Sequence, residues 1–148
     1  MIGKIAAENY LANSTLPWLA IRYFNVYGKN SKPGHFVSDQ ITKIKNQVFE
    51  LIGADETRCY CYVEDAMSAT VKLAAICNNE VINVGSDIEI TSRDAVQVIA
   101  QQLGVTATFR ELPGRVGSGS RRKPDISKLR NYIDFDPISF EEGIKQIL

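Results

Sequence analysis

The residues of this chain best suited to chemistry are arginines that stand beside predicted strands and in a glycine-rich loop. Arg58 begins a strand pattern that runs to Val63, while Arg115, Arg121 and Arg122 lie in a loop rich in Gly and Ser. A guanidinium group is planar and permanently charged, and it can donate two parallel hydrogen bonds to one anion. These arginines are therefore candidates for a local anion-binding site.

Each arginine also has a structural interpretation. Arg58 can pair with Glu56 or Asp65, and Asp65 itself is expected to cap the helix that follows it. The loop arginines can form a plain solvated loop or a nucleic-acid patch. The chain carries 17 basic and 17 acidic residues, and no aromatic residues are interleaved with the loop arginines, so the sequence argues against nucleic acid as a partner.

Two further polar residues stand at positions where ligands bind in α/β proteins. Asn25 follows a run of apolar and aromatic residues, 18–24, which predicts a strand buried on both faces. A side-chain amide at the C-terminal edge of such a strand supplies a donor and an acceptor where parallel sheets bind ligands. Lys4 lies in the first turn of a predicted amphipathic helix, where a solvated lysine is the ordinary interpretation.

Helical and strand patterns alternate along the chain, which predicts the α/β class. The expected helices cover residues 3–13, 36–46, 65–77, 91–103 and 125–132, with a last helix after Ser139. The expected strands cover residues 18–24, 48–52, 58–63, 81–84 and 107–112. Thr91 and Ser139 each begin a capping-box pattern, and residues 113–124 are expected to form a loop.

Side-chain periodicity predicts which faces of two elements are buried. In the helix at 65–77, Met67, Val71 and Ala74-Ala75 are expected on the buried stripe. In the strand at 58–63, alternation predicts Tyr60 and Tyr62 on the same face as Arg58, with Cys59, Cys61 and Val63 on the other face.

Composition limits the class of protein. With 148 residues, 45% of them hydrophobic and 23% charged, the chain is expected to form one soluble domain with an ordinary core. Its apolar runs are too short to cross a bilayer, and its N-terminus carries no secretory signal, so the cytoplasm is the expected location. Three cysteines, with His35 as the one other soft ligand in the sequence, predict packed thiols and no metal site.

Several phrases together resemble a known family. They are RYFNVYG at 22–28, RCYCYVED at 58–65 and the loop from 115 to 128 that contains RRKPDISK, with KIAAE at 4–8 ahead of them. Over nearly its whole length the chain resembles the second half of an extended short-chain dehydrogenase/reductase. This family comprises NAD-dependent nucleotide-sugar epimerases, dehydratases and decarboxylases, UDP-glucose 4-epimerase among them. The resemblance implies the last strands of a Rossmann sheet plus the small α/β substrate-binding domain.

The resemblance also implies that the dinucleotide-binding half is absent, so residues 1–148 are expected to be a single substrate-binding unit. The family's catalytic Tyr-x-x-x-Lys would need its Tyr one residue before Met1, so this chain offers Lys4 without that base. The glycines at 114–119 have the spacing of a dinucleotide fingerprint. We reject them as a dinucleotide site because residues 121–124, RRKP, follow where the phosphate-capping helix would begin.

The resemblance assigns roles to individual residues. Lys4 would be the catalytic lysine that hydrogen-bonds the nicotinamide ribose of NAD, and Tyr23 and Phe24 would lie on the strand under the nicotinamide. The substrate would be a nucleotide-diphosphate sugar whose phosphates contact Asn25 and, through guanidinium groups, Arg58 and Arg115. Further residues would line the sugar, the base or the ribose: His35, Phe36, Glu50, Ile52, Ser118 and Arg122.

We therefore interpret the chain as the substrate-binding portion of an NAD-dependent nucleotide-sugar epimerase or dehydratase, and we expect no redox chemistry from it alone. Two alternatives stay open. One is a non-catalytic nucleotide-sugar-binding or regulatory protein, and the other is a fragment whose uncovered surfaces self-associate. The expected partners are a nucleotide-diphosphate sugar, with UDP favoured over dTDP or GDP by similarity around Arg58 and Arg115, and either a second copy of the chain or the missing N-terminal half.

Overall fold

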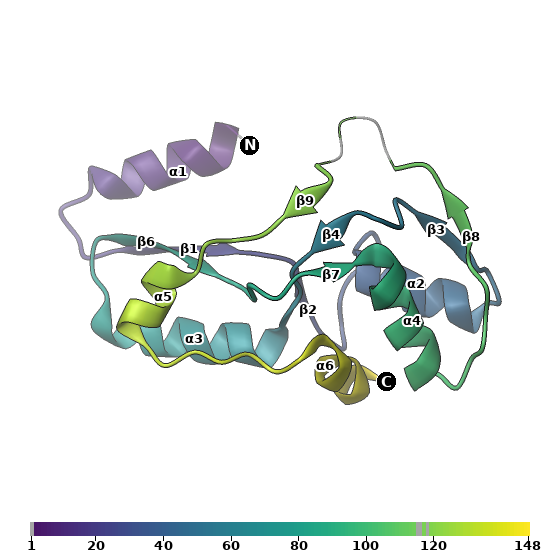
Figure 1. Cartoon of the computed structure of the whole chain (residues 1–148). Coiled ribbons are helices and arrows are strands. Elements are labelled where there is room, and N and C mark those ends of the chain that lie inside the picture. The colour runs from purple at the N-terminus through teal and green to yellow at the C-terminus, as the bar shows by residue number, and fades with distance from the viewer. Residues whose placement is uncertain (1, 115–116, 118) are drawn as a thin grey trace.

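The computed structural model describes residues 2–114, 117 and 119–148, in which helices and strands alternate along the chain (Figure 1). The helices are α1 (Ile2–Ala12), α2 (Phe36–Lys45), α3 (Val63–Ile76), α4 (Ser92–Gln102), α5 (Ser127–Tyr132) and α6 (Phe140–Ile147). The strands are β1 (Leu19–Tyr23), β2 (Val26–Tyr27), β3 (Glu50–Ile52), β4 (Thr57–Arg58), β5 (Cys61–Tyr62), β6 (Glu80–Val84), β7 (Ile90–Thr91), β8 (Arg110–Leu112) and β9 (Arg121–Arg122). The predicted α/β class is confirmed.

The strands form small sheets in which parallel pairing dominates. β1 pairs with β6, β2 with β5, and β3 with β8, each in parallel. β4 is the central strand of a fourth sheet, in which it is antiparallel to β7 and parallel to β9. Parallel neighbours need long connections, so every one of these parallel pairs joins segments that are distant in sequence.

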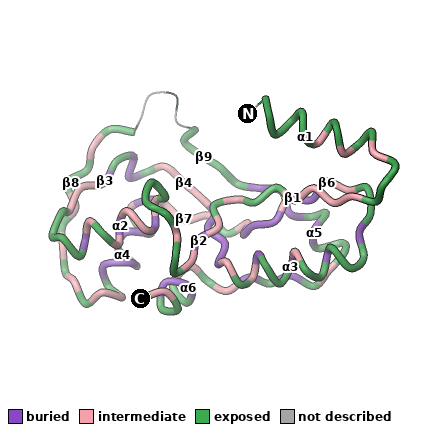
Figure 2. The backbone as a smooth tube through the Cα atoms, turned by 180° about the vertical axis from the view of Figure 1, so that it is seen from behind, coloured by how far each residue is buried: buried purple, intermediate pink, exposed green. Residues whose placement is uncertain are grey.

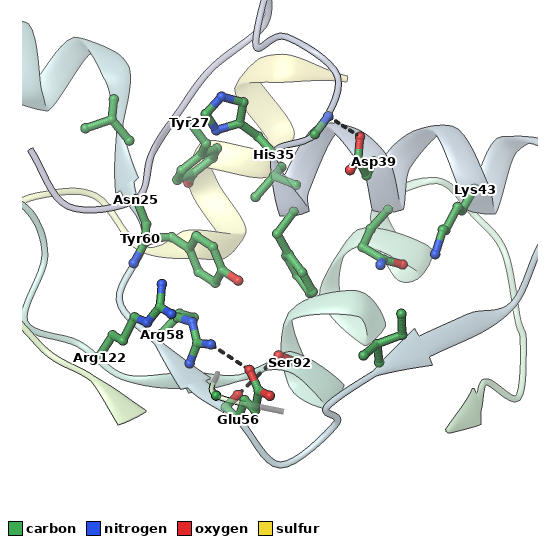
Figure 3. A pocket seen from close by; sticks show the side chains of 17 residues that line it. Asn25, Tyr27, His35, Asp39, Lys43, Glu56, Arg58, Tyr60, Ser92 and Arg122 are labelled. Carbon is green, nitrogen blue, oxygen red and sulfur yellow. Dashed lines mark hydrogen bonds and ion pairs between the residues drawn. The ribbon is translucent and has the colours of Figure 1, made fainter. Parts of the chain in front are cut away.

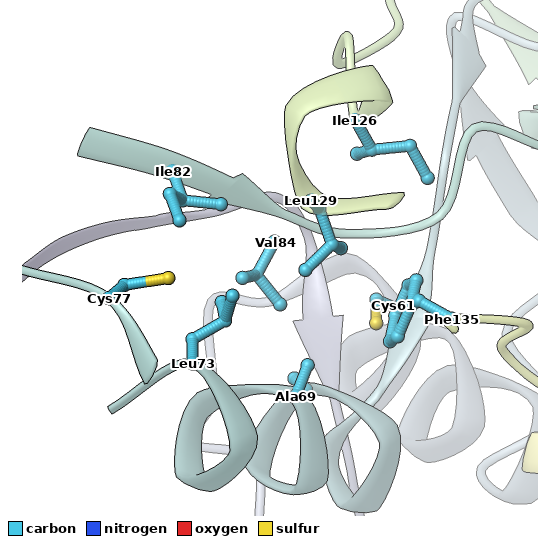
Figure 4. Packing of buried hydrophobic residues seen from close by; sticks show 10 residues of the cluster. Cys61, Ala69, Leu73, Cys77, Ile82, Val84, Ile126, Leu129 and Phe135 are labelled. Atoms are coloured by element: carbon cyan, nitrogen blue, oxygen red, sulfur yellow. The ribbon is translucent and has the colours of Figure 1, made fainter. Parts of the chain in front are cut away.

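One hydrophobic core lies against the β1–β6 pair. Leu73 of α3 and Leu129 of α5 converge with Val84 of β6, and Cys61 and Cys77 belong to the same buried cluster (Figure 4). α1 lies on the opposite side of the pair from α3 (Figure 1). α1 has no buried residue of its own (Figure 2).

A second core is rich in aromatic rings and lies among α2, α4 and α6. Tyr27 contacts Tyr60 and Phe140 at centroid distances of 6.3 and 5.4 Å, and Ile99 and Ile144 are fully buried beside them. α6 approaches Tyr27 closely at Gly143, where an added Cβ would lie 1.9 Å from the Tyr27 hydroxyl. A glycine is therefore required for α6 to dock in this position.

The predicted strand at 58–63 is wrong as a continuous element. It divides into β4 and β5, which belong to different sheets. The carbonyl of Cys59 accepts a hydrogen bond from the side chain of Asn25 at 3.0 Å, and Cys61 N donates to the Asn25 carbonyl at 3.3 Å. These bonds take the backbone away from the sheet of β4 and into register with β2. The predicted alternation holds for Tyr60, Tyr62 and Cys61, because the tyrosines join the aromatic core while Cys61 joins the other one. It is wrong for Val63, which begins α3 and packs against the aromatic core.

The predicted buried stripe of α3 is also wrong. Met67 is 43% exposed and Val71 71% exposed, while the buried positions are Ala66, Ala69 and Leu73. Ala74 and Ala75 are exposed as well. The small alanine side chains let α3 pack closely on the sheet, and this turns the larger apolar residues to the other face.

Two further expectations about local structure need correction. β1 is not buried on both faces, because Arg22 and Tyr23 are exposed and the other three residues are half-buried. In the described residues β1 pairs with β6 alone. The expected loop at 113–124 contains the strand β9, which forms through non-local pairing with β4.

Asp65 does not cap its own helix. The N-cap position of α3 is Tyr62, and Asp65 Oδ2 accepts a hydrogen bond from the backbone N–H of Ile138 at 3.0 Å. Burial raises the pKa of the Asp65 carboxyl. Its role is structural, as expected, but it fastens the segment before α6 to the start of α3.

The capping boxes are where local sequence determines local structure most directly. Thr91 Oγ1 accepts from Asp94 N at 3.0 Å, and Ser139 Oγ accepts from Glu142 N while Glu142 accepts from Ser139 N.

We predict that Ser139→Ala lowers the free energy of unfolding by about 1 kcal/mol, because the first turn of α6 loses its acceptor. Urea titration measures this. Ser68→Ala, on the exposed face of α3, is the matched control, and an equal loss there would contradict the capping explanation.

Candidate functional site

A cavity of about 510 Å³ lies between α2, the turn after β1, and the strands β4 and β9 (Figure 3). It gathers residues from five separate stretches of the chain. The residues predicted from sequence that line it are Asn25, His35, Phe36, Ile52, Arg58 and Arg122.

The register of β4 with β9 brings two guanidinium groups to one side of this cavity. Arg58 is the direct partner of Arg122 in that register, and both side chains lie at the same end of the cavity (Figure 3). Like charges that face each other on neighbouring strands repel. An anion placed between them would remove this repulsion, so the pair is suited to a phosphate or diphosphate.

Arg58 is held in place by its own neighbours. Its side chain is 13% exposed, Nη2 donates to Glu56 Oε2 at 2.6 Å, and Nη1 donates to the Thr57 carbonyl at 2.6 Å. Of the two ion pairs predicted for Arg58, the structure has the one with Glu56. Asp65 instead accepts a hydrogen bond from Ile138. A guanidinium has five N–H donors, so this pairing is compatible with ligand contact.

β9 is fastened to β4 on the side away from the cavity. Arg121 donates to both carboxylate oxygens of Glu89 at 2.7 and 2.6 Å, and Thr57 donates to the same carboxylate at 3.0 Å. The hydrogen bond from Arg121 lowers the pKa of Glu89 to about 2. Since side chains alternate along a strand, Arg121 on one face of β9 leaves Arg122 to face the cavity.

Asn25 occupies a strained turn at the edge of the cavity. Its φ of 42° lies in the left-handed region, which asparagine tolerates better than most residues. One Nδ2 hydrogen is donated to the Cys59 carbonyl at 3.0 Å. An amide nitrogen has a second hydrogen, so the residue can both fix the break between β4 and β5 and donate to a ligand.

An aromatic wall of the predicted residue Phe36 and of Tyr60, which the sequence analysis missed as a site residue, lines the middle of the cavity. Tyr60 stacks on Phe36 with ring centroids 5.7 Å apart and an interplanar angle of 24°. Burial raises the pKa of the Tyr60 hydroxyl, which therefore stays protonated at neutral pH. Strand alternation had predicted which face Tyr60 lies on, but not that this face lines the cavity.

Three polar residues of α2 also line the cavity and were missed: Asp39, Gln40 and Lys43. A usable signal existed in the sequence. Gln40 lies three residues after Val37 and four before Ile44, on the buried stripe of the helix, where a polar side chain is unusual. Asp39 has a local role, because its carboxylate accepts from Gly34 N at 2.9 Å.

Other predicted site residues do not line this cavity. Glu50 faces Arg110 at 3.5 Å, Tyr23 shares a hydrogen bond with Thr70, and Phe24 donates its backbone N–H to Val84. Arg115 and Ser118 lie outside the described residues.

Lys4 lies on α1, away from the cavity. Glu8, one turn later on the same face of the helix, accepts from Arg22 Nε at 2.8 Å. α1 runs with its N-terminus toward the carboxyl end of β1, where Tyr23 and Phe24 lie (Figure 1). The predicted cofactor residues Lys4, Tyr23 and Phe24 are thus a second group, none of which lines the cavity.

The cysteines are part of the cores. Burial raises the pKa of the Cys59 thiol to about 11 and that of Cys61 to about 12, so both remain protonated at neutral pH. Within the described part of the chain, no cluster of three or more His, Cys, Asp or Glu side chains is arranged to hold a metal ion. The helices of that part are also all too short or too polar to cross a membrane.

The sequence profile of the NAD dependent epimerase/dehydratase family matches residues 1–85. The chain belongs to this family. It is 31% identical over 153 residues to UDP-N-acetyl-alpha-D-glucosaminuronate decarboxylase of Bacillus cytotoxicus, covering 90% of this chain and 46% of that protein. The resemblance drawn from the sequence phrases is therefore confirmed.

Two solved structures share the fold. UDP-N-acetylglucosamine 4-epimerase from Methanobrevibacter ruminantium, in complex with UDP-N-acetylmuramic acid, is 26% identical with a TM-score of 0.82. UDP-glucuronic acid 4-epimerase from Bacillus cereus, in complex with UDP-glucuronic acid and NAD, is 25% identical with a TM-score of 0.84. Each match covers 97% of this chain, and 49% and 48% of the respective solved chains.

The chain thus spans about half the length of the proteins that it matches. The fold is that of part of an extended short-chain dehydrogenase/reductase, as predicted. The family is NAD-dependent, and NAD is present in the Bacillus cereus structure, so the cofactor predicted for the parent family is confirmed.

Asn25 allows a test that separates backbone strain from hydrogen bonding. We predict that Asn25→Gly costs about 1 kcal/mol of stability, since it removes the bond to the Cys59 carbonyl but accepts the left-handed backbone. Asn25→Ala is expected to cost about 1 kcal/mol more, because it adds the steric penalty of a Cβ at positive φ. Urea unfolding of the two variants measures the difference. An alanine variant as stable as the glycine variant would show that the turn carries no such strain.

Proposed function

We propose that this chain is the substrate-binding portion of an NAD-dependent enzyme that acts on a UDP-linked sugar. The observation that carries the proposal is the pairing of Arg58 with Arg122 across β4 and β9, at one end of a cavity that Asn25 also lines. Two guanidinium groups, of which Arg58 is held by Glu56 and Thr57, and an amide donor suit the charge of a diphosphate. The UDP-sugars named for the relatives support this choice of ligand.

The proposed binding mode follows from the two ends of the cavity. The diphosphate lies against Arg58 and Arg122, with the second Nδ2 hydrogen of Asn25 available to a phosphate oxygen. The nucleoside extends along the aromatic wall of Phe36 and Tyr60 toward α2. By family resemblance Arg115 would add a further guanidinium to the diphosphate, and Ser118 would lie near the ribose.

NAD would meet the protein at the other group of residues. When bound, the cofactor supplies a hydride acceptor. Lys4 offers an ammonium group to the ribose hydroxyls, and the carboxyl end of β1, with Tyr23 and Phe24, offers a flat apolar surface to the nicotinamide. Lys4 and Tyr23 are exposed to solvent, so both side chains are accessible to a ligand.

The rest of the proposed enzyme would cover apolar surface that this chain presents. Ile5 and Tyr10 of α1 are exposed, as are Met67 and Val71 of α3. We propose that residues 1–148 act as one substrate-binding unit whose α1 and α3 faces contact a dinucleotide-binding half or a second copy. Large apolar side chains on such faces favour burial against a partner.

The diphosphate site is tested by calorimetry with UDP. We predict that the chain binds UDP and that Arg58→Lys weakens binding roughly ten- to a hundredfold, because a lysine cannot make the two parallel hydrogen bonds of a guanidinium. Arg110→Lys, an exposed arginine paired with Glu50, is the matched control and is expected to bind like the unaltered chain. Absence of UDP binding by the unaltered chain would overturn the proposed function.

A second prediction concerns turnover. The purified chain with added NAD is expected to leave UDP-glucose and UDP-glucuronic acid unchanged, because the family's catalytic tyrosine is not among its residues 1–148. Chromatography of the sugar nucleotides and NADH absorbance measure this. Interconversion of UDP-sugars by the chain alone would refute its assignment as a binding portion only.

A further inference from the structure

Gln40 is a buried polar residue whose oxygen has no partner among the described residues. Its side chain is 5% exposed and lies on the same face of α2 as the buried residues Val37 and Ile44. The carbonyl oxygen Oε1 is closed off from solvent and accepts no hydrogen bond there. A buried acceptor without a donor destabilises a fold, and a donor group on a ligand would remove this cost.

A second unpartnered group lines the same cavity. The hydroxyl of Tyr60, a residue that is 7% exposed, also lacks a hydrogen-bond partner in the described residues. Figure 3 shows this hydroxyl pointing into the cavity, away from the side where Arg58 and Arg122 lie. Among the described residues, the two buried side-chain atoms without a hydrogen-bond partner therefore belong to residues of one cavity, which points to a polar occupant.

The charge of the surrounding residues indicates which part of a ligand meets Gln40. Its free atom is an acceptor, which repels a phosphate oxygen and attracts an N–H. The flat ring of Phe36 and the side chain of Ile52 line the cavity too, and they suit a planar heterocycle. The arginine pair Arg58 and Arg122 suits the phosphates instead. A nucleobase with its N–H edge toward α2 meets these conditions.

Resting on the proposed function, we propose that Gln40 is the base-recognition residue of this chain, with its Oε1 accepting the hydrogen bond of the uracil imide N–H. The terminal torsion of a glutamine is soft, so the amide can turn to meet the base at little cost. A ligand N–H satisfies the buried acceptor, and a base that lacks this hydrogen leaves the acceptor unsatisfied. Gln40 thereby makes the cavity selective for the base, while the arginines hold any diphosphate.

The test compares Gln40→Met with the unaltered chain. Methionine has a similar volume and no acceptor of comparable strength, so UDP binding is expected to weaken about tenfold by calorimetry. Affinity for inorganic pyrophosphate, which has no base, is expected to stay the same. Gln101→Met, at an exposed position of α4, is the matched control and is expected to change neither affinity.

A modified ligand tests the hydrogen itself. UDP methylated at N3 of the uracil has no imide N–H, so the unaltered chain is expected to bind it about tenfold more weakly than UDP. Gln40→Met is expected to bind UDP and its N3-methyl analogue equally. An equal further loss in the variant would show that the methyl group only clashes with the cavity, which would overturn the proposal.

Stability of the ligand-free protein separates a binding role from a structural one. Removing an unsatisfied buried amide is expected to raise the melting temperature of Gln40→Met, whereas a residue with a structural hydrogen bond would lower it on removal. A lowered melting temperature would overturn the proposal. If Gln40→Met binds UDP as tightly as the unaltered chain does, the role of Gln40 is wrong and the proposed function stands. If the unaltered chain does not bind UDP, the proposed function is wrong as well.

Discussion

The parallel pairing of β4 with β9 is the contact on which the candidate site depends. It brings Arg58 and Arg122, which are far apart in the sequence, to neighbouring positions on two strands. The repulsion between the guanidinium groups opposes this pairing, and the bonds of Glu89 to Arg121 and Thr57 hold the strands together from the other face. Glu56 offsets part of the Arg58 charge, and an anionic ligand would offset more of the charge of the arginine pair.

Asn25 gives the site its second fixed point. Its left-handed backbone and its bond to the Cys59 carbonyl end the sheet of β4 and send the chain into β5. Beyond this break, Tyr60 and Tyr62 pack into the aromatic core, and Cys61 packs against α3 and β6. The same short segment therefore joins both cores and lines the cavity. A substitution at this break is expected to change both the stability of the fold and the shape of the cavity.

The cavity varies in polarity along its length, and this variation supports the proposed function. Guanidinium groups and an amide donor lie at one end, aromatic rings line the middle, and α2 contributes a buried amide whose oxygen is unpartnered in the described residues. A sugar nucleotide has the same sequence of properties, from charged diphosphate to flat base. Membership of the NAD dependent epimerase/dehydratase family agrees with this proposal.

The sequence by itself determined the α/β class and the capped starts of α4 and α6, because periodicity and caps are local properties of the chain. Motif phrases, which are also local, identified six residues that line the cavity: Asn25, His35, Phe36, Ile52, Arg58 and Arg122. Tertiary structure alone decided the break between β4 and β5, the formation of β9 and the buried face of α3. Each depends on which distant segment supplies a hydrogen bond or a packing surface. Gln40 belongs with this second set. Its spacing identifies the buried stripe of α2, but only the packed cavity reveals that its oxygen lacks a donor among the described residues.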